Sequence, residues 1–116
     1  MTVEEVFTKL TIHMKEGVRM HEALAEAYNF LGLYGFAKCH TYHYMEEVKG
    51  YECLLWYYST RYHKLLDTTN VPMPDVIPNT WYKYNTMEVD VSTKRNSVKS
   101  MMEKWVQWER STKKLY

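Results

Sequence analysis

Long apolar runs are absent from this chain of 116 residues. No segment approaches the roughly 18 consecutive apolar residues that a bilayer-spanning helix needs. The opening MTVEEVFTKL is acidic and amphipathic, unlike the start of a secretory signal peptide. We therefore expect a cytoplasmic protein that does not interact with membranes.

An excess of charge of one sign is also missing, because 15 Lys and Arg residues oppose 14 Asp and Glu residues, for a net charge of +1. A general nucleic-acid binder needs a surplus of cations to neutralise phosphates. The composition therefore predicts no nucleic-acid partner.

Cysteines and catalytic motifs are scarce. Cys39 and Cys53 would lie about 21 Å apart on one helix, whereas a disulfide needs Cα atoms within about 7 Å. Both thiols are therefore expected to be reduced. The chain contains no glycine-rich phosphate loop, Cys-x-x-Cys pair, nucleophile elbow or His-Glu-x-x-His motif. No residue is predicted to be catalytic, and whether the chain is an enzyme stays open.

Helical periodicity is the dominant pattern that is present. Thr2 and Glu5 have capping-box spacing, which predicts a first helix over about 3–33. At about 100° per residue one stripe collects Val3, Val6, Phe7, Leu10, Met14, Gly17, His21, Leu24, Ala25, Tyr28 and Leu31. A second stripe predicts a helix over about 36–66, and it collects Phe36, His40, Tyr44, Glu47, Tyr51, Leu54, Tyr58 and Leu65.

A tight turn is expected between these helices. Gly32 and Gly35 bracket Leu33 and Tyr34, and two to five residues suffice to join an antiparallel pair. The turn is placed over Leu33–Gly35, centred near Tyr34. One continuous helix with two tolerated glycines is the alternative.

The segment 67–91 is predicted to be a crossover along the bundle. Its helix-breaking residues are Pro72, Pro74 and Pro78. Its aromatic residues, expected to hold it against the helices, are Trp81, Tyr82 and Tyr84. A third helix follows over about 93–116, capped by Ser92 or Thr93. The chain is thus predicted to be a single all-α domain, 1–116.

The third helix has an apolar side made by Val98, Met101, Met102, Trp105, Trp108, Leu115 and Tyr116. The closing STKKLY contains no helix-stop signal, so a fragment and a natural terminus are both open. Because such a stripe needs cover, we expect a homodimer with this helix or the Trp81–Tyr84 stretch in the contact.

Potential metal ligands concentrate in GFAKCHTYHYMEE, residues 35–47. Glu47 and His40 fall on the apolar stripe of the second helix, and His43 lies at its edge. With the turn centred near Tyr34, His21 and Glu47 are each thirteen residues from it and should face each other. Three interpretations stay open: a structural His–Glu pair, a site for iron or another divalent metal, and solvent-exposed side chains.

The stretches GFAKCHTYHYMEEVKGYE and MEKWVQWE resemble the second and third helices of the ferritin-like superfamily. The resemblance implies an antiparallel helical bundle with a long crossover and two metal ions held by carboxylates and histidines of facing helices. Glu47 matches the bridging glutamate of the second helix.

Several positions depart from the ferritin-like pattern. Gly50 stands where the family has a histidine, and the family's fourth helix is missing. Other carboxylates that the resemblance offers as secondary candidates are Glu22, Glu26, Glu103 and Glu109. The resemblance therefore implies an altered or degenerate metal site.

Three functions follow as hypotheses. The first is a ferritin-like module of bacterial or phage type that binds partners or serves a structural role without catalysis. The second is an iron-binding storage protein or oxidase that uses His21, His40, His43 and Glu47. The third is a small protein that binds a protein partner through its Tyr and Trp surface.

Overall fold

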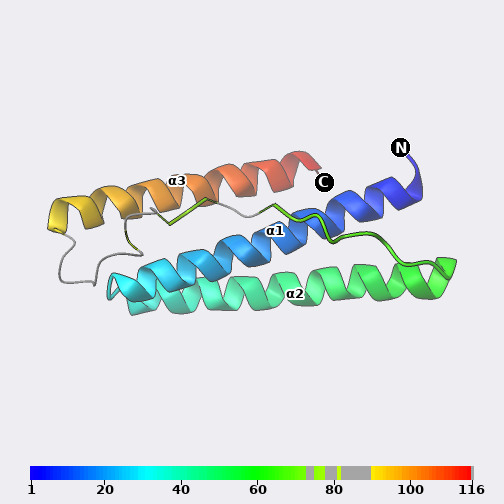
Figure 1. Cartoon of the computed structure of the whole chain (residues 1–116), viewed down its shortest axis with the longest axis horizontal. Coiled ribbons are helices and arrows are strands. Elements are labelled where there is room, and N and C mark those ends of the chain that lie inside the picture. Colours follow the sequence, from blue (N-terminus) through cyan, green and yellow to red (C-terminus); the bar gives the residue numbers. More distant parts are fainter. Residues whose placement is uncertain (73–74, 78–80, 82–89, 116) are drawn as a thin grey trace.

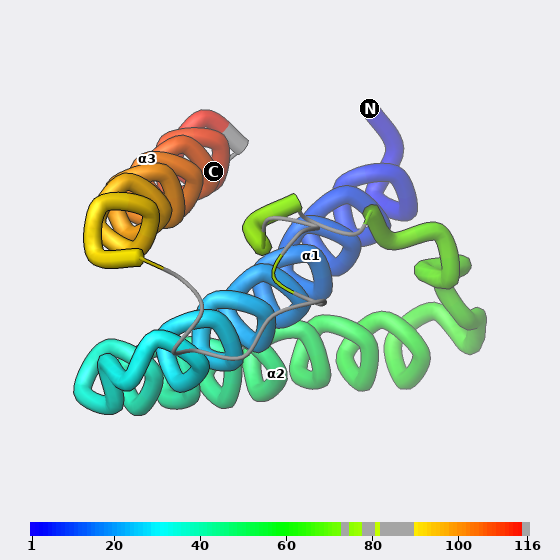
Figure 2. The backbone as a smooth tube through the Cα atoms, turned by 60° about the vertical axis from the view of Figure 1, so that its left-hand side comes forward, coloured from blue at the N-terminus to red at the C-terminus, as the bar shows by residue number. Residues whose placement is uncertain are grey.

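A computed structural model describes residues 1–72, 75–77, 81 and 90–115. Within these ranges the regular elements are three helices and no strands, as predicted for an all-α chain. They are α1 (Val3–Phe30), α2 (Tyr34–Tyr62) and α3 (Val91–Leu115). In both views of the backbone α1 lies between α2 and α3 (Figures 1 and 2).

The start of α1 is fixed by the capping box that the sequence predicts. The Glu5 backbone N–H donates to Thr2 Oγ1 at 3.1 Å, and the Thr2 backbone N–H donates to Glu5 Oε2 at 3.3 Å. Two N–H groups that the helix leaves without an internal partner are thereby satisfied.

The turn between α1 and α2 lies earlier than predicted. Gly32 adopts a left-handed φ of 77°, and its N–H donates to the Asn29 carbonyl at 3.0 Å. The Leu33 N–H donates to the Tyr28 carbonyl at 2.8 Å. These two bonds form a Schellman motif, which ends α1 at once. The predicted turn over Leu33–Gly35 is wrong, because Tyr34 and Gly35 already belong to α2.

α1 and α2 form a helical hairpin with a regular seam (Figure 1). Facing positions step by seven residues along both helices: Phe7 with Tyr57, Met14 with Gly50, His21 with His43 and Tyr28 with Phe36. The three ring pairs have centroids 5.9, 5.0 and 5.2 Å apart. A seven-residue repeat is the spacing of coiled-coil packing, and it places His21 within the seam.

α2 ends sooner than the apolar stripe of the sequence predicts. His63 caps it in the left-handed conformation with a φ of 55°, and its N–H donates to the Ser59 carbonyl at 3.0 Å. Leu65, expected on the buried stripe, therefore lies outside the helix and is 89% exposed.

The described residues between α2 and α3 lie along α1, and the chain runs there in the same direction as α1. Lys15 Nζ donates to Thr68 Oγ1 at 2.7 Å, and Phe30 packs on Trp81 with ring centroids 5.2 Å apart. Trp81 is buried, so its expected role in holding the segment to the helices is confirmed. Tyr82 and Tyr84 lie outside the described residues.

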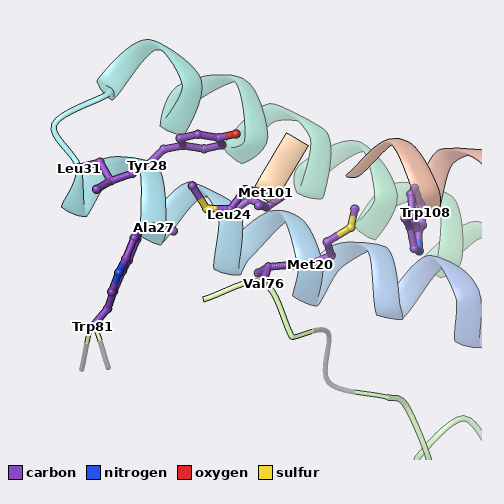
Figure 3. Packing of buried hydrophobic residues seen from close by; sticks show 9 residues of the cluster. All are labelled: Met20, Leu24, Ala27, Tyr28, Leu31, Val76, Trp81, Met101 and Trp108. Atoms are coloured by element: carbon purple, nitrogen blue, oxygen red, sulfur yellow. The ribbon is translucent and has the colours of Figure 1, made fainter. Parts of the chain in front are cut away.

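α3 begins at a different cap from the one predicted. Asp90 accepts from the Thr93 N–H at 2.7 Å and from Thr93 Oγ1 at 3.0 Å, so neither Ser92 nor Thr93 is the capping residue. From this start α3 packs Met101 and Trp108 onto the hairpin. The core comprises Met20, Leu24, Ala27, Tyr28, Leu31, Val76, Trp81, Met101 and Trp108 (Figure 3).

Candidate functional site

Three histidines from two helices meet in the seam, and we call them the histidine layer: His21 of α1 with His40 and His43 of α2. Ring centroids are 5.1 Å apart for His21 and His40, 5.0 Å for His21 and His43, and 6.0 Å for His40 and His43. His21 is 0% exposed and His40 1%. His43 is half-buried. The sequence-predicted histidines are thus brought together.

A hydrogen bond joins two members of the layer. His21 Nδ1 and His40 Nδ1 lie 2.9 Å apart, so one nitrogen donates its proton and the other accepts it. His21 Nε2 is buried and has no hydrogen-bond partner within the part of the chain that the structure describes. The Nδ1 atom of each imidazole therefore has a hydrogen-bond partner without solvent, whereas the buried Nε2 of His21 has none within the described residues.

Trp105 of α3 covers the histidine layer. Its ring centroid lies 4.7 Å from that of His40 and 5.4 Å from that of His43, in edge-on arrangements of 73° and 60°. Edge-to-face contacts of this kind are favourable beyond the area they bury. The histidine layer is consequently part of the surface of the hairpin against which α3 packs.

Burial keeps His21 and His40 neutral. Desolvation lowers the pKa of His21 to about 3, with smaller contributions from His40 and His43. Desolvation, followed by the charge of His43, lowers the pKa of His40 to about 4. A buried imidazolium would have to give up its hydration, so both side chains are uncharged imidazoles near neutral pH.

Glu47 does not pair with His21. The turn is centred on Gly32 instead of Tyr34, and this shift of two residues places His43 at the level expected for Glu47. No hydrogen bond links His21 to Glu47 among the residues described. Glu47 is half-buried, and burial, followed by the charges of Glu109 and Glu46, raises its pKa.

The secondary carboxylates lie at the surface. Glu22, Glu26, Glu103 and Glu109 are all exposed. Glu109 lies beside Trp105, the residue that covers the histidine layer, and its Oε1 accepts a hydrogen bond from Trp105 Nε1 at 3.1 Å. Its effect is to orient the tryptophan that covers the histidines.

His13 is a contributor that the sequence reasoning missed. Its ring stacks on Trp108 with centroids 4.6 Å apart, and its Nε2 lies 2.6 Å from Thr112 Oγ1. Gly17, one turn along α1, leaves the space that Trp108 fills, since a Cβ there would overlap the indole ring. The i, i+4 spacing of His13 and Gly17 was the available signal.

In residues 1–72, 75–77, 81 and 90–115, no group of three His, Cys, Asp or Glu residues is arranged to hold a metal ion. The Nδ1 atoms of His21 and His40 are directed at each other, and Cys39 and Cys53 are free and exposed.

One side of α3 carries a second candidate site, which we call the α3 face. It is a shallow groove lined by Arg95, Val98, Lys99, Met102, Glu103, Val106, Gln107 and Arg110. Met102 is 37% exposed and Val106 45%. Apolar side chains left open in a groove are typical of interaction sites.

Comparisons with protein families, with curated proteins and with solved structures found no significant match to this chain. None of the helices, over the residues described, has both the length and the apolar character that crossing a membrane requires.

Proposed function

We propose that this chain is a non-enzymatic helical binding module with a ferritin-like antiparallel arrangement, in which an altered metal position has become a packing layer. The histidine layer seats α3 on the hairpin, and the α3 face binds a protein partner. The observation that carries the proposal is the apolar strip of the α3 face, in which Met102 and Val106 are exposed and Val98 is half-buried against the core.

The layer supports this role through its contacts. His21 and His40 bond to each other, and Trp105 packs edge-on against His40. The neighbouring side of α3, which carries the strip, is therefore held at a defined angle, and a surface that is already ordered avoids ordering costs when it binds.

A displayed library of random helical peptides tests the proposal. Peptides selected on the wild-type chain should lose binding to the double variant Met102→Glu/Val106→Glu, which places charge in the strip. The control variant, Tyr42→Glu/Met45→Glu, alters residues of α2 that are 59% and 50% exposed, and binding should survive it. Selected peptides that bind both variants equally would refute an α3 binding face.

Metal binding is the second candidate, favoured by His21 Nε2, a buried nitrogen without a partner in the described structure. Neutral imidazoles are ligands for iron, zinc and other divalent metals. His21, His40 and His43 would supply nitrogen donors and Glu47 a neighbouring carboxylate, after side-chain rotation. An oxidase function would require this site.

Cobalt titration separates the two candidates. Under metal binding, Co²⁺ should give a visible absorption band saturating at one equivalent, and His43→Ala should abolish it. Under the packing role, Co²⁺ should produce no such band, and chelator should leave the thermal unfolding midpoint unchanged. Elemental analysis of the purified protein supplies an independent check.

A further inference from the structure

Charge is distributed unevenly over the helices, although the whole chain is almost neutral. α3 contains seven Lys and Arg residues against two Glu residues, for a net charge of +5. α1 contains five Glu residues against three Lys and Arg residues, and α2 has three of each sign. The helix with the open strip is therefore strongly basic.

The cations of α3 border the apolar strip. Arg95 and Lys99 lie within one turn of Val98, Arg110 lies one turn beyond Val106, and Glu103 is the single carboxylate among the lining residues. All three cations are exposed. Lys104 is different, because its Nζ donates to the Asp75 carbonyl on another side of the helix. The strip itself runs for about 12 Å, or roughly two helical turns.

We infer that the α3 face binds an acidic amphipathic helix of a partner protein, an inference that rests on the proposed function. Apolar side chains spaced by four residues offer a ridge for the groove of a second helix. Flanking Asp or Glu residues of that helix would then meet Arg95, Lys99 and Arg110. Charge complementarity of this kind sets both orientation and specificity.

Other occupants fit less well. A second copy of α3 would bring the same charge of +5 to the contact, and like charges repel. A membrane surface is normally met by exposed Trp, Phe or Leu on a basic helix. Here Trp108 is buried and Trp105 half-buried against the hairpin, which leaves smaller valine and methionine side chains in the strip.

Two synthetic 21-residue helices provide the probes. Both carry Leu at the first and fourth positions of three heptads, and the flanking positions are Glu in one and Lys in the other. Measured by fluorescence anisotropy, the Glu peptide should bind the chain at least about tenfold more tightly than the Lys peptide. Arg95→Glu/Lys99→Glu should remove this preference or reverse it.

Lys38→Glu/Lys49→Glu is the matched control, because it makes the same change of charge on exposed positions of α2. The control should leave the preference intact, and circular dichroism melts should show that all variants fold. Equal affinity for both peptides, or a preference unaffected by Arg95→Glu/Lys99→Glu, would overturn the inference. The inference would also be overturned if the wild-type chain sedimented with phosphatidylserine vesicles and the variant Arg95→Glu/Lys99→Glu did not.

Failure of the inference is distinguishable from failure of the proposed function. Library peptides that depend on Met102 and Val106 but are neutral or basic would retain the binding face and reject the acidic partner. An absence of any peptide that depends on these two residues would reject the binding face itself.

Discussion

Individual side chains of the histidine layer link the stability of the fold to pH. The pKa of His40 falls from 6.5 to about 4 on folding, and that of His21 to about 3. The unfolded chain therefore binds more protons between these values and pH 6.5. The contribution of these neutral side chains to stability should be fully present above pH 6.5 and should decrease as the pH falls through this window, by about 3 kcal/mol for the His40 shift alone.

Urea unfolding at a series of pH values measures this loss. The variant His40→Phe keeps an aromatic ring but has no proton to bind, so the slope of stability against pH between 6.5 and 4 should become shallower. Ring NMR signals of His21 and His40 that titrate near pH 6.5 in the folded protein would contradict the neutral, buried state of these two side chains.

Gly17 and Gly50 provide a matched pair of helical glycines. A Cβ at Gly17 would overlap the rigid ring of Trp108, so Gly17→Ala should displace the indole and destabilise the fold by about 1–3 kcal/mol. A Cβ at Gly50 would meet only the flexible end of Met14. Gly50→Ala should be near neutral, since Ala favours a helix by about 1 kcal/mol. Equal unfolding free energies for both variants would show that Trp108 does not occupy the Gly17 position.

Among the helices, the α1–α2 junction depends on one backbone conformation. Gly32 has a φ of 77°, which an L side chain adopts at a cost of roughly 1–2 kcal/mol. Gly32→Ala should lower the free energy of unfolding by about that amount, as measured by chemical denaturation. Gly35→Ala is the control, because Gly35 lies within α2 and a methyl group there would enter open space. A larger loss for Gly35→Ala would place the turn where the sequence first suggested it.

In the hairpin, the helices could be predicted from the sequence, but the register between them could not. The capping box at Thr2, the helical periods and the break after α2 follow from local rules, and they were predicted. The register was not, because Gly32 and Gly35 both suit a turn and only the Schellman hydrogen bonds at Gly32 decide between them. That difference of two residues exchanges Glu47 for His43 opposite His21.

The cover of the site by α3 was beyond prediction for another reason. Trp105 reaches His40 and His43 only once α3 is placed over the hairpin, and the segment before α3 contains no strong periodicity. The helical spacing of α3 identified Trp105 and Trp108 as residues of its apolar face. Spacing within one helix carries no information about which residues of another helix it will contact.

For the molecule as a whole, the homodimer stays a prediction, and its salt dependence identifies the contact. Two α3 helices, each with a net charge of +5, should associate more strongly as salt screens their repulsion. If α3 is the dimer contact despite this repulsion, light scattering at micromolar concentration should show a mass rising from 14.0 kDa toward twice that value only with added salt. A mass that stays at 14.0 kDa would reject the dimer, and a dimer weakened by salt would place the contact elsewhere.

The location of a bound partner helix tests the central claim most directly. Amide NMR spectra of the labelled chain should be recorded while the Glu-flanked peptide is added. We expect chemical-shift changes concentrated between residues 95 and 110 of α3, strongest at Met102 and Val106, and weakened by salt. Changes centred instead on the exposed α2 residues Tyr42, Met45 and Trp56 would contradict the account, because the binding face would then lie on α2 and not on α3.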